Sequence, residues 1–212
     1  MNRSLIACAM AALLAMHAQA EDAPAAASAS APAEAAAEPK APPAPPVELK
    51  RLSAPEGRAV TISSLTFDAP PGASDAYAIL VYEGPGGVKQ VSVKARDRVV
   101  NFAGQPPGVG KLLQLTVPPG PYLMRYVYGS YQPKDADKRR EFWIPLGHRY
   151  TVAPNEVVYL GNLHVVLDGT PVAVVSDLRA RDFYALAQQD EINDMSNLQL
   201  RLPQPSGLPY PY

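Results

Sequence analysis

Cysteine and histidine are nearly absent from the chain. Its 212 residues include one cysteine, Cys8, and three histidines. A lone cysteine cannot form a disulfide within the chain, so side-chain packing has to hold the fold together. The shortage of histidine leaves few groups that exchange protons near neutral pH, which disfavours acid-base enzymes.

An excess of charge of either sign is absent as well. Lys and Arg together number 19, and Asp and Glu number 20, which gives a formal net charge of −1. A balance this close to zero predicts no long-range attraction to nucleic acid or to an anionic membrane surface. We therefore expect no nucleic-acid partner.

No apolar run is long enough to persist as a membrane span. The run from Leu5 to Met16 is much shorter than the roughly 20 residues that cross a bilayer. It follows Arg3 and precedes the small residues Ala18 and Ala20, which is the order of a secretory signal peptide. We expect cleavage after Ala20 and a periplasmic or secreted mature protein without a transmembrane span. Because Arg3 is removed, the mature net charge is 18 − 20 = −2.

Cys8 leaves one alternative open. The sequence Leu5-Ile6-Ala7-Cys8 resembles the box that precedes the lipidated cysteine of bacterial lipoproteins. Cleavage before Cys8 would leave the signal with three apolar residues and would strand the rest of the run on the mature chain, so we expect no lipidation. The mature chain then contains no cysteine, and thiol chemistry is excluded.

Large apolar residues are missing between residues 21 and 46. Twelve of these 26 residues are Ala and seven are Pro. This composition cannot bury enough apolar surface to offset the entropy lost on ordering. The sequence therefore predicts a disordered arm over residues 21–46, a folded domain over 47–202, and a proline-rich irregular tail over 203–212.

The domain carries the pattern of a β protein. Short β-branched and aromatic runs alternate with turn sequences such as Gly84-Pro85-Gly86-Gly87 and Asp168-Gly169, which supply the φ values that hairpins need. No helix alternates with the strands, so we expect a mainly β fold built as a single antiparallel β-sandwich, prealbumin-like or Ig-like, or a closed barrel. The predicted strands are Val60–Phe67, Tyr77–Tyr82, Val88–Lys94, Leu112–Val117, Tyr122–Tyr131, Glu141–Ile144, Val157–Leu167 and Pro171–Ser176.

One helix is predicted near residues 177–189. The segment from Leu178 to Gln189 contains no Gly or Pro, and either Ser176 or Asp177 is a suitable cap. Four residues at helical spacing form its expected buried stripe, and we expect the helix to close one end of the sandwich. The stripe consists of Ala180, Phe183, Tyr184 and Ala187.

Two segments resemble known sequences. Leu115 to Leu123, with Pro118-Pro119-Gly120 between two apolar runs, resembles a strand-turn-strand signature of prealbumin-like sandwiches in carboxypeptidase regulatory-like modules. Tyr150 to Leu163 resembles a segment of small exported bacterial proteins of unknown function. The resemblance implies a sandwich of seven or eight strands and carries no catalytic residue. Asn155 stands where such segments usually have Gly, so we expect a left-handed backbone there.

Signatures of catalysis are missing. The stretch Gly104 to Lys111 superficially suggests a phosphate loop, but Gln105 stands where its first Gly is needed and Leu112 where Ser or Thr is needed. No Gly-x-Ser-x-Gly elbow is present. We therefore assign no catalytic residue, metal or cofactor and predict a protein that is not an enzyme.

Two histidines remain after the leader. His148 is expected in a solvated turn between Pro145 and Arg149. His164 shares a strand face with Asn162, and with Asp168 beyond them these residues are the candidates for a metal site or a metal-dependent hydrolase. That alternative requires a second ligand or a carboxylate within hydrogen-bond reach of the His164 ring.

A tyrosine row is the most suggestive feature. Strict alternation places Tyr122, Tyr126 and Tyr128 on one face of a single strand, and Trp143 is expected to join the same surface. Exposed, such rings form a platform for sugars or peptides; buried, they are ordinary core. The sequence weighs toward burial, because Arg125 indicates that the opposite face is the wetter one.

These observations favour a non-enzymatic binding module of the cell envelope, with an envelope protein as its partner. The alternative is a glycan-binding module that uses Tyr122, Tyr126, Tyr128 and Trp143 as ligand-binding residues. A metal-dependent hydrolase or a small outer-membrane barrel is less favoured, since prolines interrupt the strands and the Leu208–Tyr212 end.

Overall fold

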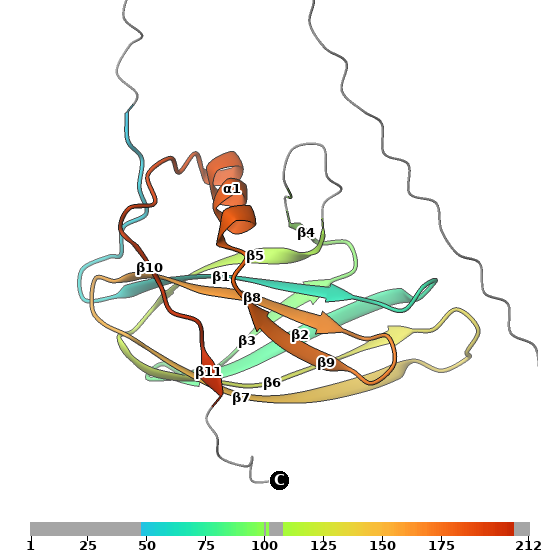
Figure 1. Ribbon diagram of the computed structural model, residues 1–212. Helices are drawn as coiled ribbons and strands as arrows, with labels where there is room; N and C mark the ends of the chain where they lie inside the picture. Colours follow the sequence, from blue (N-terminus) through green and yellow to red (C-terminus); the bar gives the residue numbers. More distant parts are fainter. Residues whose placement is uncertain (1–47, 100, 102–107, 206–212) are drawn as a thin grey trace, which may run out of the picture. The chain divides into compact units, whose positions relative to one another are not determined.

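The computed structural model describes residues 48–99, 101 and 108–205, all of which fall in one compact unit. The predicted signal, the predicted arm and most of the predicted tail lie outside the described residues. The described chain folds into two β-sheets that face each other, with a single short helix (Figure 1). The expected mainly β sandwich is therefore confirmed.

The first sheet has the strand order β10-β8-β1-β5-β4, with β9 also paired to β8. Most of its strands coincide with β-branched runs in the sequence, because such side chains pack well on a pleated surface. Its strands are β1 (Ala59–Asp68), β4 (Arg98–Val99), β5 (Gly108–Val117), β8 (Val157–Val166), β9 (Val172–Ser176) and β10 (Leu198–Leu200).

The second sheet has the strand order β11-β7-β6-β2-β3. All of its pairings are antiparallel, as expected. Its strands are β2 (Ser74–Gly84), β3 (Gly87–Lys94), β6 (Gly120–Gln132), β7 (Arg140–Val152) and β11 (Gln204–Pro205). The tail predicted as irregular thus contributes a short pairing to this sheet before the described residues end.

Pairing in the first sheet departs from the antiparallel expectation. β1 and β10 both run parallel to β8. A parallel neighbour requires a long connection, and here residues 69–156 separate β1 from β8. Turn signals between neighbouring strands could not reveal this pairing.

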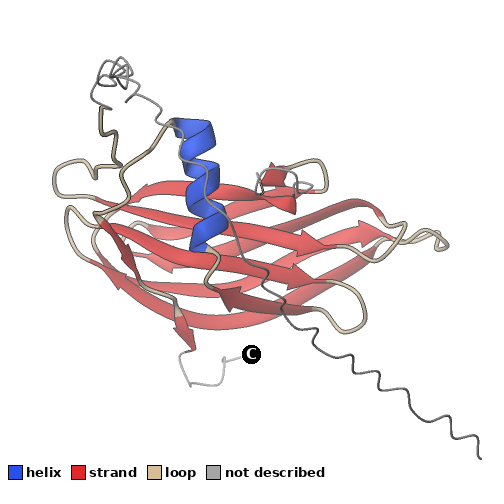
Figure 2. Ribbon diagram, turned by 45° about the horizontal axis from the view of Figure 1, so that its top comes forward, coloured by secondary structure: helices blue, strands red, loops and turns tan. Residues whose placement is uncertain are grey.

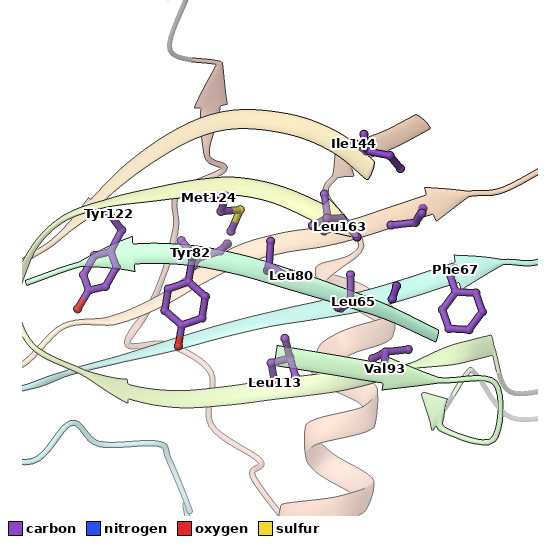
Figure 3. Close-up of a cluster of buried hydrophobic side chains, with 14 of the residues drawn as sticks. Leu65, Phe67, Leu80, Tyr82, Val93, Leu113, Tyr122, Met124, Ile144 and Leu163 are labelled. Atoms are coloured by element: carbon purple, nitrogen blue, oxygen red, sulfur yellow. The ribbon is translucent and has the colours of Figure 1, made fainter. Parts of the chain in front are cut away.

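The main core lies between the two sheets. Figure 3 shows Leu65, Phe67 and Leu113 of the first sheet and Leu80 of the second projecting into one cluster. Each is at most 6% exposed. Burial of one such side chain contributes about 1.5–3 kcal/mol, so the core can hold the sandwich without a covalent staple.

Helix α1 (Arg179–Asp190) packs on the outer side of the first sheet, so it covers a sheet face rather than closing one end (Figure 2). A second apolar cluster forms there from Val60, Ile62, Tyr159 and Leu186. In the part of the chain that the structure describes, no helix is long and apolar enough to cross a membrane.

The details of the helix differ from the prediction. Its buried residues are Asp182, Ala185 and Leu186, which lie on a different stripe from the predicted one. Leu178 is the N-cap residue and makes no side-chain cap bond, although Asp177 Oδ1 accepts a hydrogen bond from the Arg179 backbone N–H at 3.1 Å. A buried carboxylate at the centre of the face explains the error, because an apolar pattern cannot indicate it.

The left-handed residue expected in the β7–β8 turn is confirmed. Asn155 has φ 63°, and its Oδ1 accepts a hydrogen bond from the Gly57 backbone N–H at 3.0 Å. Asn adopts this conformation more readily than most residues, and here its side chain is held by the Gly57 backbone, 98 residues away in the sequence.

Candidate functional site

The predicted tyrosine row is split between two faces of the second sheet. The pairing of β6 with β2 runs from Tyr82↔Met124 to Val81↔Tyr126, so β6 carries one extra residue at this point. An extra residue inverts the alternation of every side chain that follows. Tyr122 therefore faces the core, whereas Tyr126 and Tyr128 face outward, and the expectation of a single row is wrong.

Tyr122 is a core residue. It is 5% exposed, and Figure 3 shows its ring beside the Tyr82 ring and near the Met124 side chain. Its ring stacks on Tyr150 at a centroid distance of 5.2 Å, and its hydroxyl donates to the Pro118 carbonyl at 2.7 Å. Burial raises the pKa of the Tyr122 and Tyr150 hydroxyls. Tyr122 is therefore not available to a ligand.

Tyr126, Tyr128 and Trp143 gather on the outer face of the second sheet. The Tyr126 ring centroid lies 6.0 Å from that of Tyr128 and 5.6 Å from that of Trp143. The Trp143 side chain is 47% exposed, and both tyrosines are half-buried. Together with Tyr77 they line a shallow hollow of about 630 Å³. We call these four residues the aromatic platform.

Polar groups border the aromatic platform. Gln90 and Glu141 line the same hollow, and the Tyr128 hydroxyl lies 3.5 Å from Gln90 Oε1. The guanidinium carbon of Arg139 lies 5.9 Å from the Tyr77 ring centroid, a cation–π distance. Apolar ring faces with a few polar groups at the edge suit a flat ligand that carries hydroxyls or amides.

A second shift in pairing occurs on β8. Ile62 pairs with Tyr159, but Ser64 pairs with Asn162, so β8 has one residue more than β1 at Gly161. Gly161 has φ 88°, and a Cβ there would lie 2.7 Å from the Ser176 carbonyl oxygen. The shift turns Asn162 and His164 toward the side of the sheet that carries helix α1.

A buried carboxylate organises this side of the sheet. Asp182 is 0% exposed, and its Oδ2 accepts hydrogen bonds from the Ser64 hydroxyl and the Tyr159 hydroxyl, both at 2.7 Å. Its Oδ1 accepts from Arg181 Nε at 2.9 Å and from Arg181 Nη2 at 2.7 Å. Burial, then the hydrogen bond to Asp182, raises the pKa of Tyr159, so this hydroxyl stays protonated and donates.

The polar contacts continue along β1 and β8. Asn162 Oδ1 lies 2.8 Å from Ser64 Oγ and 3.0 Å from Thr66 Oγ1. His164 Nδ1 lies 2.9 Å from Thr66 Oγ1, and its Nε2 lies 3.3 Å from Asp68 Oδ2. The carboxylate that a hydrolase at His164 would need is thus present, supplied by Asp68.

The donors can be assigned by counting hydrogens and lone pairs, if Ser64 Oγ and Asn162 Oδ1 share no hydrogen across their 2.8 Å contact. Ser64 has one hydroxyl proton, and it stabilises the Asp182 carboxylate best. Asn162 Oδ1 then accepts from Thr66 and from Arg181 Nη2, which lies 3.2 Å away, and this fills its two acceptor positions. Thr66 must in turn accept its other hydrogen bond from His164 Nδ1. In this arrangement His164 is not a base toward Thr66.

No group of three or more His, Cys, Asp or Glu side chains suited to a metal ion occurs among the described residues. The candidates Asn162 and His164 do share a face, but the structure places Asp68 beside the His164 ring where the sequence suggested Asp168. The segment 102–107, which contains most of the rejected phosphate loop, lies outside the described residues.

His148 is not in a solvated turn. β7 continues through it, and its Nδ1 is buried without a hydrogen-bond partner among the described residues. Burial lowers the pKa of its ring, partly opposed by a hydrogen bond to the backbone of Leu146. Pro145 and Gly147 resembled a turn in the sequence, whereas the strand absorbs them by a shift in pairing between Tyr126↔Pro145 and Met124↔His148.

Sequence reasoning missed Ser64, Thr66, Arg181 and Asp182. Single polar residues on two strands and a helix carry no local pattern, and Ser64 and Asp182 are 118 positions apart. The one available signal was Gly161, because a glycine inside a strand often marks a bulge.

Comparison with family models, with curated proteins and with solved structures finds no match for this chain.

Proposed function

We propose that this protein is a non-enzymatic binding module of the bacterial cell envelope and that its aromatic platform binds a glycan. The outward position of Tyr126, Tyr128 and Trp143 is the observation that carries this proposal. The export pattern of residues 1–20 supports the envelope as its location. A sugar ring presents an apolar face to stack on an aromatic ring and hydroxyls that suit Gln90 and Glu141.

Intrinsic fluorescence tests the glycan proposal directly, because Trp143 is the only tryptophan of the chain. The mature chain, residues 21–212, is titrated with a tetramer of N-acetylglucosamine and with maltotetraose. We expect a saturable change in emission with at least one of them. Tyr126→Ala should weaken that binding about tenfold, which corresponds to about 1.4 kcal/mol.

A matched control is Tyr184→Ala, which removes a half-buried tyrosine from helix α1. This variant should bind the glycan as the parent does. No saturable change with either sugar, or equal weakening by both variants, would contradict the proposal.

A protein partner is the second candidate function, and edge strand β9 favours it. Val172 and Val174 are 45% and 53% exposed, and β9 contains no charged residue. The edge strand β3 of the other sheet carries Lys89 and Lys94, which oppose strand addition. Recovery of an envelope protein by the parent but not by Val174→Lys in a pull-down would favour this candidate.

The non-enzymatic part of the proposal is tested at His164. The proton arrangement derived above places a hydrogen on Nδ1, which a base activating Thr66 would lack. Long-range ¹H–¹⁵N spectra of the histidine rings report which nitrogen is protonated. The proposal that the protein is not an enzyme would be refuted if Nδ1 is unprotonated and if the parent hydrolyses an ester that Thr66→Val does not.

A further inference from the structure

A hollow of about 420 Å³ lies on the outer side of the first sheet, at the base of helix α1. Strands β1, β5, β8 and β9 and the start of the helix contribute to its lining. It is separate from the aromatic platform, which belongs to the other sheet. Its walls combine the side chains of Arg181 and His164 with aliphatic side chains.

Arg181 is held rigidly at this hollow. Its Nε and Nη2 bond to Asp182, and Nη2 also donates to Ser64 Oγ at 2.7 Å. The Arg181 side chain is 13% exposed and lines the hollow. A guanidinium carries five N–H donors, and none of the hydrogen bonds among the described residues uses its Nη1. The two Nη1 hydrogens therefore remain available to an acceptor.

The charge of the surroundings limits that acceptor. Asp182 offsets Arg181, and Asp68 offsets His164 when its ring is protonated. A bound group with two negative charges would leave more charge uncompensated in this partly buried site than a group with one, and the extra charge is costly. A single carboxylate, which matches the planar guanidinium, fits better.

The remaining wall is aliphatic. Val109, Val174 and Leu178 also line the hollow. Such a wall favours an apolar body attached to the carboxylate. We propose that this hollow is a second binding site, which takes a small apolar monocarboxylate on Arg181 Nη1.

Ligand binding to the mature chain is measured by ¹H–¹⁵N chemical-shift titration. The probes are hexanoate, its uncharged analogue hexanamide, and inorganic phosphate. We expect saturable shifts at Asn162, His164 and Arg181 with hexanoate, an affinity at least fivefold weaker for hexanamide, and weaker binding of phosphate. Equal affinities for hexanoate and hexanamide, or tighter binding of phosphate, would overturn the proposal.

Variants on β9 provide the structural test. Val174→Trp should fill the hollow and weaken hexanoate at least tenfold, whereas Val172→Trp, on the same strand face but outside the hollow, should not. Arg181→Lys keeps the charge but loses the Nη1 donors, so it should weaken hexanoate at least fivefold in a chain whose spectrum shows it folded. Equal behaviour of the two tryptophan variants would reject the site. Glycan binding at the aromatic platform is unaffected by any of these outcomes.

Discussion

Tyr122 and Tyr126 lie four residues apart on strand β6, yet Tyr122 faces the core and Tyr126 faces solvent. One additional residue in β6 relative to β2 causes the inversion. The two tyrosines consequently differ in what their removal costs.

Truncation of these two side chains should separate stability from binding. We expect Tyr122→Ala to lower the free energy of unfolding by about 3–5 kcal/mol, as for other buried aromatics. Tyr126→Ala should lower it by about 1 kcal/mol or less and should impair glycan binding instead. Urea unfolding checks the first expectation, and similar losses in both variants would contradict the inverted arrangement.

Gly161 should tolerate substitution poorly. Its φ of 88° disfavours any L side chain, and an added Cβ would lie 2.7 Å from both the Ser176 carbonyl oxygen and Leu202 Cδ2. We expect Gly161→Ala to cost more than about 2 kcal/mol. Gly169 is the matched control, with φ 75° and nothing within 4 Å of an added Cβ, so Gly169→Ala should cost about 1 kcal/mol. Thermal or urea unfolding of both variants measures the difference, and equal costs would show that crowding at Gly161 is unimportant.

Asp182 should be essential to the fold on the helix side of the first sheet. Asp182→Ala leaves Arg181, Ser64 and Tyr159 without their shared acceptor, and losing one member of a buried pair typically costs about 3–5 kcal/mol. Asp190→Ala, at the exposed end of the same helix, should change stability by no more than about 0.5 kcal/mol. Urea unfolding of both variants measures the two free energies and tests whether Asp182 is essential. A small effect of Asp182→Ala would mean that water replaces the carboxylate.

His148 should make the protein less stable in mild acid. Its pKa in the folded state lies below the usual histidine value of 6.5 because burial disfavours the charged ring. The unfolded chain therefore binds the proton more readily, and stability present above pH 6.5 is lost as the pH falls below that value toward the lowered pKa. His148→Gln should flatten the dependence of unfolding free energy on pH between about 7.5 and 5.5. An unchanged slope would contradict the burial of this ring.

Most strand positions followed from the sequence, because β-branched runs and Gly-Pro turns mark them locally. The short strands β4, β10 and β11 and the part of β7 after Ile144 were not predicted. The side of the sheet that each side chain of β6 and β8 faces did not follow from the sequence, since a single extra residue inverts it. In β6 the extra residue is Arg125 and not a glycine, so nothing in the sequence indicates the shift. The sequence therefore predicted correctly that Tyr126, Tyr128 and Trp143 share one surface. It placed Tyr122 on that surface as well, which is wrong.

The site beneath helix α1 was beyond sequence reasoning for a different reason. Ser64, Asn162 and Asp182 meet only after β1 and β8 pair in parallel and the helix folds back on them. A local sequence pattern cannot predict contacts between residues that are so far apart in the chain. His164 was noticed, but its partners Thr66 and Asp68 lie almost a hundred residues earlier.

The parallel pairing of β1 with β8 also has a kinetic consequence. Strand β1 can pair with β5 earlier, but it cannot pair with β8, its other neighbour, until residues 157–166 are present. The domain therefore has a high contact order, and such domains form slowly. For a chain that is exported as we propose, slow closure is an advantage, because translocation requires an extended polypeptide and the strand that would lock β1 in place emerges late.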